Sequence, residues 1–67
     1  MFLNERNMKR KEILQKLAKA GFTFQEGANH THILKNENYI SAISRQTEIS
    51  IKIVRKIEKK TGVQLLN

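Results

Sequence analysis

The apolar positions of residues 8–20 repeat with the spacing of a helix. At roughly 100° per residue, four apolar side chains fall on one side of that helix: Ile13, Leu14, Leu17 and Ala18. Asn7 can cap the first turn, and Gly21 follows the last periodic residue, where a left-handed conformation favours glycine. The pattern therefore predicts an amphipathic helix from residue 8 to residue 20.

Three short segments between this helix and residue 44 have the alternation and the β-branched or aromatic content of strands. The segments are residues 22–25, 30–35 and 39–44. Polar turns of three or four residues separate them. Because connections this short join antiparallel neighbours, the segments predict a three-stranded antiparallel meander.

A second helical pattern runs from residue 51 to residue 61, with Ser50 at its N-cap position and Gly62 just beyond its end. Its apolar side consists of Ile53, Val54 and Ile57. Its polar side carries five cations, namely Lys52, Arg55, Lys56, Lys59 and Lys60. The predicted order is α-β-β-β-α, an α+β fold in which two helices cover one face of the three-stranded antiparallel sheet.

The chain has the length of one small domain. Its 67 residues contain no internal repeat and no linker, so residues 1–67 are predicted to form a single domain. Residues 1–7 are expected to be a flexible extension, and the apolar tail at 63–66 is expected to fold back on the core. No apolar run reaches the length of about eighteen residues that spans a bilayer, and a secretory h-region is absent. A cytoplasmic protein with no membrane partner is expected.

The charge balance narrows the choice of partner. Thirteen Lys and Arg against six acidic residues, all Glu, give a formal charge of +7. Such a surplus attracts polyanions, of which nucleic acid is the commonest in a cytoplasm, and an acidic protein is the second candidate. A membrane surface ranks lower, because no helix pairs the basic residues with a face of Trp and Phe.

Side chains able to do covalent chemistry are scarce. The chain has no Cys, no Asp and only two His, which excludes disulfides, zinc knuckles and thiol catalysis and disfavours paired-carboxylate hydrolysis. His30 and His32 project from one face of a strand. Third and fourth ligands at a recognised spacing are missing, so neither a metal nor any other cofactor is expected.

A histidine on a basic surface suits proton transfer, because its unperturbed pKa of about 6.5 lies near cytoplasmic pH. RNA carries its own nucleophile, the 2′-hydroxyl. A protein that holds the backbone in line and moves a proton can therefore cleave it. Composition alone favours the alternative that both histidines are ordinary exposed strand residues.

Segments 9–14 and 20–22 and the turn Gly27-Ala28-Asn29-His30 resemble the HicA toxins, small RNA-cleaving proteins of type II toxin–antitoxin pairs. The resemblance extends over residues 8–63. It implies a double-stranded-RNA-binding-domain-like fold, metal-independent cleavage of mRNA by acid–base catalysis, and His30 as the catalytic residue. It also implies inhibition by a HicB-type antitoxin, which binds operator DNA through its own domain. Family members often follow the third strand with a segment holding a proline and a histidine, and residues 44–47 have neither.

Further residues are candidates for holding the turn or the RNA. Gly27 is expected to adopt a positive φ, to end the first strand, or to do both. Asn29 is expected either to hold the turn or to contact a phosphate. Lys35 and Arg45 flank the strands near the site and are expected to position RNA. On the second helix, phosphate contacts are expected from Lys52, Arg55, Lys56 and Lys59. A merely solvated basic face is the alternative there.

The aromatic residues Phe24 and Tyr39 are expected to pack in the small core rather than to stack on bases. Two other functions remain open from the sequence. A non-catalytic module for duplex RNA would bind RNA in a salt-sensitive way without cutting it. An adaptor for an acidic protein would have no affinity for RNA.

Overall fold

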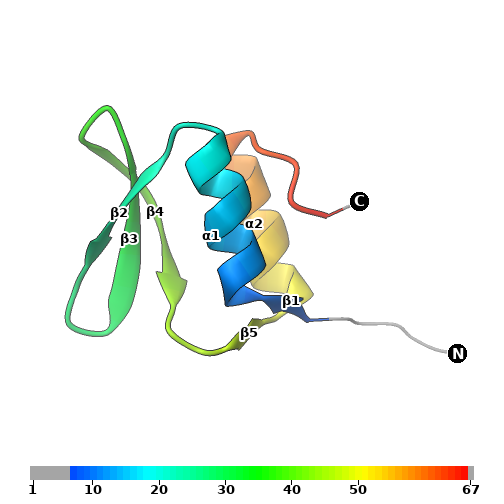
Figure 1. Cartoon of the computed structure of the whole chain (residues 1–67). Helices are drawn as coiled ribbons and strands as arrows, with labels where there is room; N and C mark the ends of the chain where they lie inside the picture. Colours follow the sequence, from blue (N-terminus) through cyan, green and yellow to red (C-terminus); the bar gives the residue numbers. More distant parts are fainter. Residues whose placement is uncertain (1–6, 67) are drawn as a thin grey trace, which may run out of the picture.

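The order α-β-β-β-α predicted from the sequence is confirmed in the computed structural model, which describes residues 7–66 (Figure 1). The main elements are α1 (Arg10–Lys19), β2 (Thr23–Glu26), β3 (His30–Lys35), β4 (Asn38–Ser44) and α2 (Ile51–Thr61). Two short strands, β1 (Met8–Lys9) and β5 (Glu48–Ile49), precede the helices. No helix in the described part of the chain is long and apolar enough to cross a bilayer.

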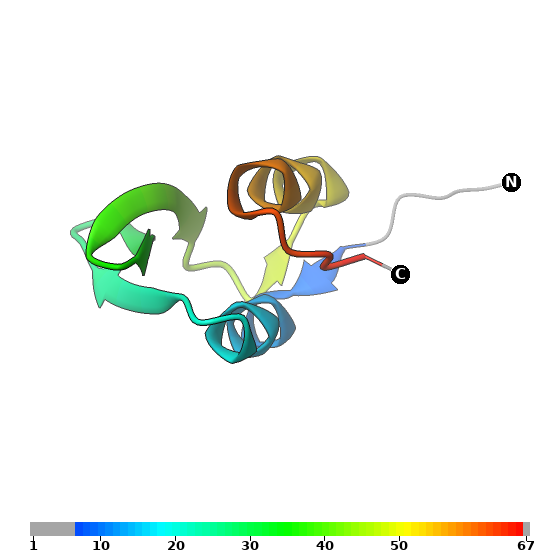
Figure 2. The same ribbon diagram turned by 90° about the horizontal axis from the view of Figure 1, so that it is seen from above.

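The three central strands form an antiparallel sheet in the order β2-β3-β4. Both helices lie on the same side of this sheet, which curves toward them (Figure 2). Asn36 and Glu37 form the turn between β3 and β4, with φ angles of 52° and 69°. Positive φ at both central residues matches the right-handed twist of the flanking strands. β4 therefore begins at Asn38, one residue before the predicted start of that strand.

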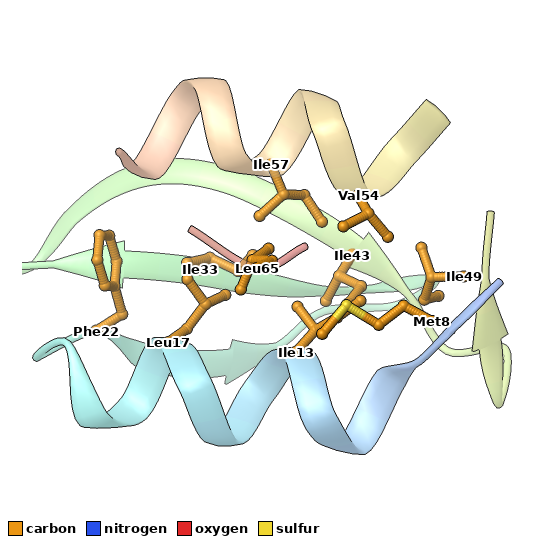
Figure 3. Close-up of a cluster of buried hydrophobic side chains, with 10 residues drawn as sticks. All are labelled: Met8, Ile13, Leu17, Phe22, Ile33, Ile43, Ile49, Val54, Ile57 and Leu65. Atoms are coloured by element: carbon orange, nitrogen blue, oxygen red, sulfur yellow. The ribbon is translucent and has the colours of Figure 1, made fainter. Parts of the chain in front are cut away.

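Ten buried side chains fill the space between the helices and the sheet (Figure 3): Met8, Ile13, Leu17, Phe22, Ile33, Ile43, Ile49, Val54, Ile57 and Leu65. The tail folds back through Leu65 as expected. Phe24 is half-buried and packs against this core, which confirms its expected role. Ala18 is exposed and Ile53 is 38% exposed, so placing these two on the buried sides of their helices was wrong. Val54 and Ile57, three residues apart, define a narrower buried stripe on α2.

The start of the first helix differs from the prediction. Met8 and Lys9 are extended and pair with Ile49 and Glu48, and α1 begins at Arg10. Asn7 does not act as the N-cap; its side chain donates to Glu48 Oε1 at 3.2 Å. Pairing Met8 with Ile49 brings both side chains into the core, because they are 8% and 0% exposed. This burial outweighs the local capping preference. Residues 1–6 of the expected extension lie outside the described residues.

α1 ends before Gly21 as predicted, whereas α2, in the described part of the chain, starts at the predicted residue without the expected side-chain cap. Gly21 has φ +95°, and Phe22 N–H donates to Leu17 O while Gly21 N–H donates to Ala18 O, each at 3.0 Å. This is a Schellman motif, and Leu17 and Phe22 supply its buried apolar pair. Ser50 occupies the N-cap position of α2, although within residues 7–66 its side chain makes no capping hydrogen bond.

One carboxylate holds the C-terminal tail against the helices. Glu58 Oε2 accepts hydrogen bonds from the backbone N–H groups of Leu65 and Leu66 at 2.7 and 2.8 Å. Lys16 Nζ donates to Leu65 O at 3.0 Å. The bonds from Leu66 and Leu65 favour the ionised form, so they lower the pKa of Glu58 below its ordinary value of 4.5.

Candidate functional site

The turn between β2 and β3 presents His30 to solvent. β2 ends at Glu26 and β3 begins at His30, which lies opposite Ser44 of β4. Gly27 N–H donates to His30 O at 2.8 Å and closes the turn. The His30 side chain is exposed. A hydrogen-bonded turn therefore fixes the backbone of His30 while its imidazole stays free to meet a ligand.

Gly27 is required for space rather than for backbone conformation. It lacks the positive φ that Gly21 and Gly62 adopt, so the expectation of a positive φ was wrong, whereas the expectation that Gly27 ends the first strand is confirmed. A Cβ on Gly27 would lie 3.0 Å from His30 O and 3.0 Å from Cε1 and Nε2 of His32. The His32 ring thus packs directly on the backbone of the turn.

Both histidines lie on the face of the sheet that the helices leave uncovered. Thr31 and Ile33, which alternate with them, are fully buried on the opposite face. The His32 ring meets Tyr39 edge to face, with centroids 5.4 Å apart and planes at 75°. Tyr39 is 61% exposed, so its expected place in the core was wrong. An exposed aromatic ring instead lies beside His32.

An ionic cluster ties this turn to the rest of the fold. Glu26 Oε1 pairs with Arg45 Nη2 at 3.0 Å and accepts a hydrogen bond from Thr31 Oγ1 at 3.0 Å. Arg10 Nη2 lies 3.9 Å from Glu26 Oε2 and donates to Thr31 Oγ1. The fully buried Thr31 hydroxyl is satisfied in this way. The cluster joins the start of α1 to β2, β3 and the residue after β4.

Arg45 lies next to the candidate site, as predicted, and holds the turn. Its guanidinium donates to Gly27 O and, at 3.5 Å, to Ala28 O. The side chain of Asn29 makes no hydrogen bond within residues 7–66, so its expected turn-holding role falls to Arg45 and to the Gly27 N–H. Asn29 is exposed beside His30, where its other expected role, contact with a phosphate, stays a prediction.

Lys35 lies at the far end of β3, and its predicted place near His30 was wrong. Lys35 is five positions beyond His30 along the strand, about 16 Å at roughly 3.3 Å per residue. Lys35 Nζ lies 3.4 Å from Ala20 O and 4.8 Å from the centre of the Phe22 ring. The cation therefore caps the carbonyl end of α1.

The predicted cations of α2 are all exposed: Lys52, Arg55, Lys56 and Lys59. α2 packs against β4, so these residues form a basic surface on a different element from the His30 turn. Their contact with RNA stays a prediction.

The structure adds a basic hollow that sequence reasoning did not single out. The hollow has a volume of about 550 Å³ and is lined by Lys9, Arg10, Lys11, Leu14, Gln15, Arg45 and Thr47. The start of α1, the turn between β2 and β3, and the end of β4 all lie at one end of the molecule (Figure 1). The run of three cations at residues 9–11 was the available signal. Because residues 8–20 were predicted to form one helix, these three cations were not expected to line a hollow together with Arg45 and Thr47.

Comparisons with protein-family models, with curated proteins and with solved structures find no match. Function is therefore inferred from the residues of the site. Within residues 7–66, no group of three or more His, Cys, Asp or Glu is placed to hold a metal ion. The chemistry available at the turn is that of imidazole and of surrounding cations, which suits proton transfer at a phosphate ester.

Proposed function

We propose that the protein is an endoribonuclease that cleaves mRNA by metal-independent acid–base catalysis, with His30 as the catalytic residue. We further propose that it is the HicA-type toxin of a type II toxin–antitoxin pair, inhibited by a HicB-type antitoxin that alone contacts DNA. The observation that carries the proposal is the exposed His30 on a turn that Arg45 holds, where Arg45 also lines a hollow together with the cations Lys9, Arg10 and Lys11.

The reaction that suits this site is transfer of the phosphoryl group within RNA. The 2′-oxygen attacks the adjacent phosphorus, the bond to the 5′-oxygen breaks, and the products are a 2′,3′-cyclic phosphate and a 5′-hydroxyl. Neutral His30 accepts the proton of the 2′-hydroxyl, and water supplies a proton to the departing 5′-oxygen. The resulting imidazolium returns its proton to solvent, so charge and protons balance over one turnover.

The charges around the turn favour an anionic transition state. Arg10 and Arg45 carry two positive charges against the single negative charge of Glu26. Lys9 and Lys11 line the adjoining hollow. Cations fixed beside a phosphate stabilise the charge that develops on its oxygens, and being fixed before the reaction they need little rearrangement. The hydrogen bond from Arg45 to Gly27 O holds the turn, and with it the backbone of His30, in a fixed position relative to these cations.

Induced expression in bacteria tests the biological role. The wild-type chain is expected to arrest growth and deplete mRNA, and His30→Ala to do neither at equal protein level. His32→Ala serves as the matched control, since it removes the neighbouring imidazole but keeps His30. Co-expression of the protein encoded beside this chain is expected to restore growth. Equal toxicity and equal RNA loss for wild type and His30→Ala would refute the assignment.

The basic surface of α2 favours one alternative, a non-catalytic module for duplex RNA. This function predicts salt-sensitive binding with intact RNA for both wild type and His30→Ala. Duplex and single-stranded RNA incubated with purified protein and resolved on denaturing gels would distinguish it from the ribonuclease. Absence of RNA binding even at low salt would instead indicate an adaptor for an acidic protein.

A further inference from the structure

The hollow at the start of α1 combines two kinds of lining. Lys9 and Lys11 contribute basic side chains to its lining, and Leu14 contributes a half-buried apolar side chain. Gln15 adds an amide that can both donate and accept hydrogen bonds. A volume of about 550 Å³ lies within the range of roughly 300–1,000 Å³ typical of small-ligand sites. Such a lining suits a ligand with a flat apolar part and an anionic part.

The two lysines are the cations left available to a ligand. Arg10 and Arg45 already bind Glu26, and each also donates to backbone or hydroxyl oxygens of the turn region. Lys9 and Lys11 are exposed and make no salt bridge with any acidic residue in the described part of the chain. Lys9 is the register partner of Glu48 across the β1–β5 pair, so Lys11 is the lysine of the hollow with neither a salt bridge nor an acidic register partner within residues 7–66.

Arg45 connects the hollow to the turn that carries His30. Its side chain lines the hollow, and its guanidinium donates to Gly27 O and Ala28 O. Arg10, which also lines the hollow, donates through Nε to Ser44 O at 3.1 Å, and Ser44 is the register partner of His30. Arg10 and Arg45 thus link the hollow to the end of the sheet where His30 lies, and an RNA strand that contacts both must cross that end from the uncovered face.

We infer that the hollow is a subsite for one nucleotide of single-stranded RNA adjacent to the cleaved linkage. Its phosphate lies against Lys9 and Lys11 and its base against Leu14, with Gln15 in reach of the base edge. The inference rests on the proposed ribonuclease function and adds where the strand runs. The contacts nearest to the cleaved linkage would then come from β1 and α1, whereas the cations of α2 would contact more distant phosphates.

Binding measured on the His30→Ala background tests the subsite without cleavage. The probe is a fluorescein-labelled single-stranded RNA, and the matched pair is Lys11→Gln and Lys19→Gln. Both residues are exposed lysines of α1, about 12 Å apart along the helix axis, which exceeds the Debye length of about 10 Å at 0.1 M salt. Lys11→Gln is expected to weaken binding about fivefold at 0.1 M salt and to reduce the salt slope by about 0.7, the value for one single-strand phosphate contact. Lys19→Gln should change binding less than about twofold.

A second measurement locates the contact on the RNA. Methylphosphonate, which is neutral, replaces each phosphate in turn next to the cleavage site. One substituted position is expected to weaken binding by His30→Ala protein and to leave binding by His30→Ala/Lys11→Gln protein unchanged, because that phosphate interacts with Lys11. A scan with no such position would overturn the subsite.

The outcomes separate this inference from the proposed function. Equal weakening by Lys11→Gln and Lys19→Gln would overturn the subsite, while cleavage by protein with intact His30 would still support the ribonuclease. Selective weakening by Lys11→Gln with RNA left uncut would support the subsite as a binding site and overturn the ribonuclease. Absence of any RNA binding at low salt would overturn both.

Discussion

Substituting Gly27 by alanine tests the reason why the turn carries glycine. The added Cβ would lie 3.0 Å from His30 O and from Cε1 and Nε2 of His32, closer than an ordinary van der Waals contact. The His32 ring can rotate away, since it is a half-buried side chain beside an exposed Tyr39. His30 O cannot move freely, because it accepts the 2.8 Å hydrogen bond that closes the turn.

The expected cost follows from these contacts. Overpacking typically costs about 1–3 kcal/mol, and the partly mobile ring places Gly27→Ala near the lower end, at about 1–2 kcal/mol. For a domain of this size, each kcal/mol lowers Tm by roughly 4–8 °C. Thermal unfolding followed by circular dichroism measures this, and Ala28→Ser, at an exposed position in the same turn, is the control.

A double variant separates the two contacts. Gly27→Ala/His32→Ala removes the ring clash and leaves the carbonyl clash, so the loss of stability caused by Gly27→Ala should be smaller in the His32→Ala background than in the wild-type background. RNA cleavage by Gly27→Ala should fall in kcat more than in KM, because the displaced carbonyl belongs to His30. Unchanged Tm and unchanged cleavage for Gly27→Ala would refute the steric argument.

Three further variants test other parts of the account. Leu17→Ala should cost about 2–5 kcal/mol, enough to unfold much of so small a domain, and chemical denaturation measures it; a cost under about 1 kcal/mol would contradict the core assignment. Glu58→Gln should cost about 1–2 kcal/mol at neutral pH, through its bonds to Leu65 and Leu66. Because folding lowers the pKa of Glu58 below 4.5, its stabilisation is present above that pH and is lost as pH falls through the lowered pKa. The stability gap between wild type and Glu58→Gln should therefore close in acid, and a constant gap from pH 7 to pH 2 would contradict the role of its charge. Arg45→Ala should lower kcat for RNA with little change in Tm, because a half-exposed ion pair contributes little stability. An unchanged kcat would contradict the role of Arg45 in holding the His30 turn.

Most of the fold could be predicted because its signals are local. The periodicity of the helices, the glycines at 21 and 62 and the polar turns marked the main elements to within one or two residues. The start of α1 could not be predicted in this way. It depends on the pairing of Met8 with Ile49, about forty residues away. No local pattern in the sequence indicates that these two residues pair.

The candidate site was predicted only in part, and the reason is again distance along the chain. The turn with His30 is contiguous and could be found. The role of Gly27 depends on the ring of His32, and the place of Lys35 depends on which end of β3 the site occupies. The hollow needs Arg45 and Thr47 to lie beside Lys9 and Lys11, an arrangement that only the packed structure provides.

The central claim is that His30 transfers a proton during cleavage of RNA at its own 2′-hydroxyl. The most direct measurement is cleavage of an oligoribonucleotide by purified wild type and His30→Ala, in EDTA, with a second substrate carrying one 2′-deoxy residue at the cut site. Wild type should cleave the first substrate to a 2′,3′-cyclic phosphate, His30→Ala should be at least about 100-fold slower, and the deoxy linkage should stay intact. Equal rates for the two proteins, or cleavage at the deoxy position, would contradict the account.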